Sequence, residues 1–198
     1  QAIAKNMPNG FPDVGFNYLN HVTIEQQLKH YLNYTSQQLS RHTLTLLNTE
    51  SNLTATFGDG QSSYLMGGRA DRIDQFDGKI RVIDYKTGHV DSGDLKVPVR
   101  RRSESNLDYL RQIPDKALQL LLYKYMYLKE HPTLSPDAVE GAIHGLRYPR
   151  NVEFVLTKTN PKKDDFDADA SFLDDSTFVA DMEGGPEHTA PVHQVHRS

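Results

Sequence analysis

The order of hydrophobic and polar positions predicts β-strands in the first half of the chain. Residues 79–88 form an apolar, β-like run that ends in charged residues, and residues 68–74 read as the strand before it. The Asp77-Gly78 pair between these runs is a strong hairpin signal. Residues 53–57 also alternate between apolar and polar side chains. The three segments together predict an antiparallel meander.

Helices are predicted before and after this meander in the sequence. Apolar residues from 24 to 32 follow helical spacing, and Thr23 to Gln26 fits a capping box at the start of that helix. Residues 37–47 are compatible with either a helix or a strand. A second helix is predicted from Pro114 to about Glu130, with a core stripe made of Leu118, Leu121, Leu122, Tyr125 and Leu128.

The remaining segments complete the predicted fold. Residues 89–113 lack a hydrophobic period and read as one long loop. Residues 139–148 and 152–156 predict two further strands. Helices and strands in this order predict an α/β domain with a mixed central β-sheet flanked by helices.

The end of the run at 79–88 carries the candidate chemistry. Because side chains alternate along a strand, Asp84 and Lys86 share a face, and the hairpin would bring Asp71 close to Asp84. Two carboxylates and a lysine suit a divalent metal such as Mg²⁺ or Mn²⁺ and an activated water. Lys86 would hold or deprotonate that water, or stabilise the charge of the transition state. The alternative is an Asp–Lys pair that neutralises itself at a sheet edge.

Asp71, the hairpin, Asp84-x-Lys86 and the later Gln119-x-x-x-Tyr123 together resemble the PD-(D/E)XK nuclease superfamily. The closest likeness is to its RecB-like branch, found in bacterial helicase–nuclease repair complexes, and it covers about residues 64–128. The resemblance implies a restriction-endonuclease-like core and all five of these residues in the active site. It also implies DNA end processing in recombination and repair, beside a helicase.

The resemblance also directs attention to residues outside the motif. Superfamily members usually carry a further acid or histidine upstream, and Glu50 is the candidate for this third metal ligand; a solvated glutamate is the alternative. Basic residues beside Asp71 and in the predicted loop would contact DNA phosphates, which supply most sequence-independent affinity, unless they are simply solvated. These residues are Arg69, Arg72, Arg100, Arg101 and Arg102.

Composition limits the other possibilities. The 198 residues include no cysteine, which excludes disulfides, zinc–thiolate sites and the iron–sulfur cluster of some RecB-like relatives. The net charge is −4, but residues 161–185 hold eight acidic and two basic residues, so the rest of the chain is +2. We expect one nuclease domain over residues 1–160, with its motif core at about 50–130, and an acidic, flexible segment over 161–198. No membrane span is expected, and a cytoplasmic location fits.

Two functions from different classes remain at this point. The first is a metal-dependent deoxyribonuclease of the exonuclease type. The second is a non-catalytic nucleic-acid-binding or scaffolding module that keeps the nuclease fold, and it is motivated by the lack of a confidently matched upstream ligand. An RNA-directed or structure-specific nuclease is a variant of the first, since the sequence does not separate exonuclease from endonuclease or DNA from RNA.

Overall fold

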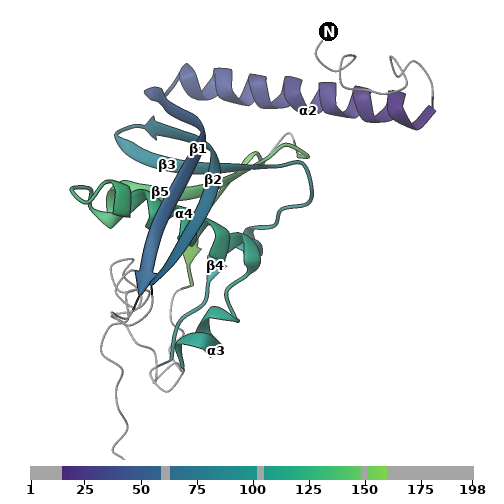
Figure 1. Cartoon of the computed structure of the whole chain (residues 1–198). Coiled ribbons are helices and arrows are strands. Elements are labelled where there is room, and N and C mark those ends of the chain that lie inside the picture. Colours follow the sequence, from purple (N-terminus) through teal and green to yellow (C-terminus); the bar gives the residue numbers. More distant parts are fainter. Residues whose placement is uncertain (1–14, 59–62, 102–104, 149–150, 160–198) are drawn as a thin grey trace, which may run out of the picture.

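The computed structural model describes residues 15–58, 63–101, 105–148 and 151–159, which form a mixed β-sheet covered by helices (Figure 1). The five main strands lie in the order β1-β2-β3-β5-β6, and only β3 and β5 are parallel within this sheet. The predicted fold class is therefore confirmed. The described elements are α2 (Gly15–Leu39), β1 (Leu44–Gly58), β2 (Ser63–Phe76), β3 (Lys79–Lys86), η1 (Ser92–Leu95), β4 (Lys96–Val97), α3 (Asn106–Leu110), α4 (Asp115–Glu130), η2 (Pro136–Ala138), β5 (Val139–Gly145), β6 (Glu153–Val155) and β7 (Thr157–Lys158).

The predicted hairpin between β2 and β3 is present. Asp77 and Gly78 both have positive φ angles, 47° and 91°, as a two-residue type I′ turn requires. The Asp77 carboxylate also accepts hydrogen bonds from the Thr43 backbone N–H (2.9 Å) and from His42 Nδ1 (2.6 Å), which ties the turn to the start of β1. The turn fixes a register in which Arg72 faces Ile83 and Asp74 faces Arg81.

The helix predicted at residues 114–130 is present as α4; it covers one face of the sheet and lies in the chain between the parallel strands β3 and β5. The predicted core stripe is partly wrong. Leu121 and Tyr125 are buried, but Leu118 and Leu122 are only half-buried, and Leu120 is fully buried instead. The reason lies on β5, where Gly141 presents no side chain. A Cβ there would lie 3.1 Å from the Leu120 Cβ, so the helix rests on the sheet through Leu120.

Helix α2 lies on the opposite face and is longer than the sequence predicted. It begins by Gly15, so the predicted capping box at Thr23 is wrong: the Thr23 hydroxyl lies mid-helix and donates to the Leu19 carbonyl (2.8 Å). Its C-terminal half contacts the sheet through Tyr31 and Tyr34. Its first turns project beyond the sheet (Figure 1). Among the described residues, no helix combines the length and the hydrophobicity needed to cross a membrane.

The segment at 89–113 is more ordered than the long loop that the sequence predicted. It contains η1, β4 and α3, and five of its apolar residues are buried: Val90, Leu95, Val97, Tyr109 and Ile113. These side chains pack against α4 or the β5–β6 end of the sheet. They are spaced too irregularly for a helical or strand period, so the hydrophobic pattern did not reveal them.

Charged residues fill the space between α2 and the sheet. Asp74 is fully buried and receives two hydrogen bonds from the Arg81 guanidinium (2.8 and 2.9 Å) and an ion pair from Arg72 (2.6 Å). Arg81 continues to Glu153 on β6 (2.6 Å). A buried carboxylate is stable only with such partners. The network therefore holds β2, β3 and β6 together.

A buried histidine closes this network. His144 on β5 is 2% exposed, with Nδ1 3.2 Å from the Tyr31 hydroxyl and Nε2 3.5 Å from Glu153. Burial lowers the pKa of His144 below its ordinary value of 6.5, since a charged imidazole would lose its hydration, and Arg81 and Arg72 act in the same direction although Glu153 opposes them.

We expect acid to destabilise the fold through His144. Just below about pH 6.5, His144 is protonated in the unfolded chain but stays neutral in the folded chain. The unfolding free energy therefore falls as the pH falls from about 6.5 toward the lower pKa of the folded state. Melting temperatures between about pH 7.5 and about pH 5.5 would measure the slope. His144→Gln should flatten it, whereas His131→Gln, at an exposed position, should not. Equal slopes in the two variants would contradict this account.

Candidate active site

The candidate site forms where β2 and β3 separate. The ladder between these strands ends at the pair Arg72–Ile83, and the next residues outward are Asp71 and Asp84. The Asp71 Oδ2 atom accepts a hydrogen bond from the Tyr85 backbone N–H (2.7 Å). The Lys86 Nζ atom lies 2.8 Å from Asp84 Oδ2. The predicted convergence of two carboxylates and one lysine is therefore present.

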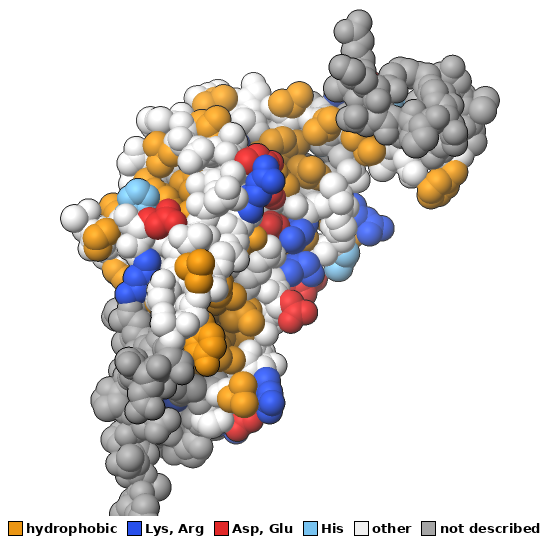
Figure 2. All heavy atoms as spheres, in the orientation of Figure 1, with side chains coloured by type: hydrophobic (Ala, Val, Ile, Leu, Met, Phe, Trp, Pro, Cys, Tyr) orange, Lys and Arg blue, Asp and Glu red, His pale blue; other side chains and the backbone are white. Residues whose placement is uncertain are grey.

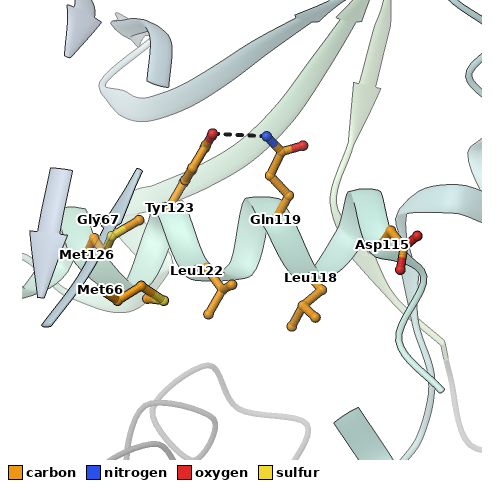
Figure 3. Close-up of a pocket in the computed structure, with 8 residues that line it drawn as sticks. All are labelled: Met66, Gly67, Asp115, Leu118, Gln119, Leu122, Tyr123 and Met126. Carbon is orange, nitrogen blue, oxygen red and sulfur yellow. Dashed lines mark hydrogen bonds between the residues drawn. The ribbon is translucent and has the colours of Figure 1, made fainter. Parts of the chain in front are cut away.

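Helix α4 contributes two further polar side chains. The Gln119 Nε2 atom donates to Asp84 Oδ1 (3.2 Å) and to the Tyr123 hydroxyl (2.9 Å), as Figure 3 shows for the second bond. The two residues stand four apart, so they lie on the same side of the helix. Two hydrogen bonds therefore connect Tyr123 to Asp84 through the carboxamide of Gln119.

A glycine permits this approach of the helix. A Cβ on Gly68 would lie 2.6 Å from Tyr123 Cε1 and 2.9 Å from Met126 Cε, both closer than real Cβ contacts. Gly68 therefore lets the Tyr123 ring rest against β2. The sequence placed Gly68 at the start of the predicted strand 68–74 but indicated no role for it, because the need for a residue without a side chain appears only once the helix is docked.

The environment of Asp84 opposes its negative charge. Its carboxylate is almost fully buried, and this desolvation raises the pKa of Asp84 above its ordinary value of 3.8. The nearby Asp71 carboxylate raises this pKa further, while Lys86 and the hydrogen bond from Gln119 lower it. The site thus holds a carboxylate that lacks sufficient positive charge around it.

These residues fit a hard divalent cation. The Asp84 Oδ2 atom is buried yet accepts no well-aligned hydrogen bond within the described part of the chain, although the Lys86 ammonium is close. Within that same part, no group of three or more histidine, aspartate or glutamate side chains is placed to hold a metal. Mg²⁺ commonly uses one or two carboxylates and completes its shell with water and substrate phosphate, so Asp71 and Asp84 would be sufficient.

Glu50, the predicted third ligand, is placed differently. It lies on β1 between the residues that pair with Arg72 and Ala70, with a positive φ of 53°. Its exposed carboxylate forms an ion pair with Arg69 (2.5 Å). The structure therefore brings Glu50 and Arg69 to each other, outside the contacts that join Asp71, Asp84 and Lys86.

The other predicted DNA contacts are divided by the fold. Arg72 is buried on the α2 side, where it pairs with Asp74 and donates to the Tyr31 hydroxyl (3.2 Å), a placement that does not suit a phosphate contact. Arg101 is exposed, and the half-buried Arg100 guanidinium lies 6.0 Å from the centre of the Tyr109 ring. Arg102 lies outside the described residues.

Sequence reasoning missed the buried partners behind the site. Asp74 and Arg81 directly face each other across the hairpin, and this register follows from the Asp77-Gly78 turn. Opposite charges at facing positions were thus a signal available in the sequence. Tyr31 and His144 carried no such signal, because they meet Tyr85 and each other across 54 to 113 residues of chain.

The family assignment agrees with this geometry. The family model of the PD-(D/E)XK nuclease superfamily matches residues 4–193. A search of curated proteins gives no significant match. The family match spans nearly the whole chain and includes the site built by Asp71, Asp84 and Lys86, on a mixed sheet of the kind that the superfamily resemblance implied. The chain belongs to the PD-(D/E)XK nuclease superfamily.

Proposed function

We propose that this protein is a metal-dependent deoxyribonuclease that uses Asp71, Asp84 and Lys86 to hydrolyse phosphodiester bonds. The observation that carries the proposal is the buried Asp84 carboxylate, which faces a second carboxylate and a lysine at the open end of the β2–β3 hairpin. Membership of a nuclease superfamily supports the same reaction. Mg²⁺ or Mn²⁺ is the proposed cofactor, held by Asp71 and Asp84.

The side chains of the site have separable roles in this proposal. The bound cation would supply positive charge for the phosphate and lower the pKa of a water. The Tyr85 backbone N–H fixes Asp71, and Gln119 fixes Asp84, so both carboxylates are held before substrate arrives. Lys86 is one-third exposed and can donate hydrogen bonds toward solvent, where the attacking water and the phosphate would lie.

The RecB-like resemblance supports a narrower proposal. It favours exonuclease-type processing of DNA ends in recombination and repair, with a helicase subunit or domain as partner. Arg100 and Arg101 are the described candidates for phosphate contacts outside the metal site. The alternative, a non-catalytic DNA-binding module, is favoured by one observation: the described residues place no third acid or histidine at the site.

The decisive measurement is cleavage of end-labelled single- and double-stranded DNA in Mg²⁺, Mn²⁺ or EDTA. We expect metal-dependent products from the wild type and a loss of about 10²–10⁴-fold in Lys86→Ala, the range for a positioned proton-transfer or charge-stabilising group. Lys79→Ala is the matched control, because Lys79 lies at the other end of β3 and pairs with Glu140.

Each outcome decides between the candidate functions. Full activity in Lys86→Ala would remove Lys86 from the mechanism. Absence of cleavage by the wild type, combined with binding of DNA that weakens with salt, would support the non-catalytic module. The sizes of the labelled products from 5′- and 3′-labelled strands would separate exonuclease from endonuclease action and give the strand polarity.

A further inference from the structure

A pocket adjoins the candidate active site. It has a volume of about 280 Å³ and lies between the edge of α4 and strand β2 (Figure 3). Its lining residues are Met66, Gly67, Asp115, Leu118, Gln119, Leu122, Tyr123 and Met126. Two of them, Gln119 and Tyr123, belong to the chain of contacts that ends at Asp84. The side chain of Gln119 therefore lines the pocket and also contacts Asp84, the proposed metal ligand.

The pocket wall combines two kinds of surface. Leu118, Leu122 and Met66 supply an apolar surface, and Figure 3 shows the two leucines on the side of the helix away from the Gln119–Tyr123 pair. Tyr123 adds an aromatic ring, and Gln119 adds a carboxamide. An apolar lining with a few polar groups that fix orientation is typical of a ligand site. A flat, aromatic ligand with a polar edge matches it.

We propose that this pocket receives one unpaired nucleobase of the strand being cut, next to the scissile phosphate. The proposal rests on the proposed nuclease function, which places a phosphate at Asp84. A base attached to a neighbouring nucleotide then reaches the pocket across Gln119. A base inside a duplex has both faces covered by its neighbours and cannot present one to a leucine and methionine wall, so the base must be unstacked.

The surface around the pocket agrees with a single strand as substrate. Tyr64 exposes 69% of its surface and lies two residues before Met66 on β2, so its side chain is on the same face of the strand as the pocket wall. Figure 2 shows hydrophobic side chains exposed beside the β1–β2 hairpin, below a group of acidic and basic side chains. Apolar and aromatic side chains bind unpaired bases without regard to sequence.

The test changes the substrate rather than the protein. Single-stranded oligonucleotides would carry one abasic residue at successive positions around a defined cleavage site, and cleavage rates and binding in EDTA would be compared with the intact strand. We expect one position where loss of the base slows cleavage and weakens binding by about 5–150-fold, the range for one stacked base. Equal rates and equal binding at all positions would overturn the proposal.

A pocket variant provides the second arm. Leu122→Asn should remove most of the difference between intact and abasic strands, whereas Leu107→Asn, at an exposed position on α3 outside the pocket, should preserve it. Melting temperatures would confirm that both variants fold. An unchanged difference in Leu122→Asn would assign the pocket to another occupant, such as an apolar side chain of a partner protein.

The nuclease and pocket proposals fail in different ways. No metal-dependent cleavage of the intact strand would contradict the nuclease, and the binding comparison in EDTA would still decide the pocket. Cleavage that is insensitive to every abasic position would contradict the pocket alone.

Discussion

Replacing Asp84 with Asn is expected to abolish DNA cleavage and, at the same time, to raise the melting temperature of the metal-free protein. The first effect follows from the proposed role of Asp84 as a metal ligand. Without this ligand the site would no longer hold the cation whose positive charge stabilises the transition state, and loss of one such stabilising group costs about 10²–10³-fold or more in rate. The second effect follows from the burial of this carboxylate beside Asp71.

The sign of the stability effect comes from the pKa of Asp84. Because the folded-state pKa lies above the ordinary 3.8, folding disfavours the charged form, and this penalty is fully present at neutral pH. It disappears as the pH falls through the folded pKa toward the unfolded one. Asn is uncharged and of nearly equal size, so it removes the penalty, and Lys86 is exposed enough to be solvated without its partner.

Thermal melts in EDTA and cleavage assays with Mg²⁺ would test both effects on one pair of variants. Asp94→Asn is the matched control. The pKa of Asp94 is lowered by hydrogen bonding to the Asp91 backbone and by Lys116, so its replacement should lower the melting temperature and leave cleavage unchanged. A lower melting temperature in Asp84→Asn would contradict the account of an active site that is held at a cost in stability.

Replacing Asp74 with Asn is expected to produce the largest loss of stability. Asp74 is fully buried and is bound by Arg81 through two hydrogen bonds and by Arg72 through an ion pair. Removal of its charge leaves the buried guanidinium groups of Arg72 and Arg81 without the negative charge that both of them share. Breaking a buried ion pair by removing one partner costs about 3–5 kcal/mol. For a chain of this size that corresponds to a melting temperature lower by about 6–20 °C.

Urea or thermal unfolding of Asp74→Asn would measure this loss against Asp137→Asn, whose side chain lies at an exposed position on η2. We expect the control to differ from the wild type by less than about 0.5 kcal/mol. A similarly small change in Asp74→Asn would show that Glu153 alone compensates Arg81 and that the network is not a major source of stability.

The features of this site that could be predicted are those that depend on residues close together in the sequence. The Asp77-Gly78 turn fixes which residues of β2 and β3 face each other, so Asp71 and Asp84 could be placed together from local pattern. The Gln119–Tyr123 pair was likewise readable, because helical spacing fixes the side on which both residues lie. The boundaries of α2 were not readable, because helical spacing was recognised only over residues 24–32. The elements within 89–113 were not readable either, because their apolar residues lack a regular period.

The sequence by itself thus determined the mixed sheet, the hairpin, the covering helix α4 and the grouping of two carboxylates and a lysine at the end of β3. Tertiary structure alone decided that Arg72 is buried with Asp74 rather than exposed beside Asp71, and that Glu50 pairs with Arg69. It also decided that α4 leaves a pocket beside Gln119. The reason is physical: strand and turn periods act between near neighbours, whereas burial and pocket shape depend on helices that dock from distant parts of the chain.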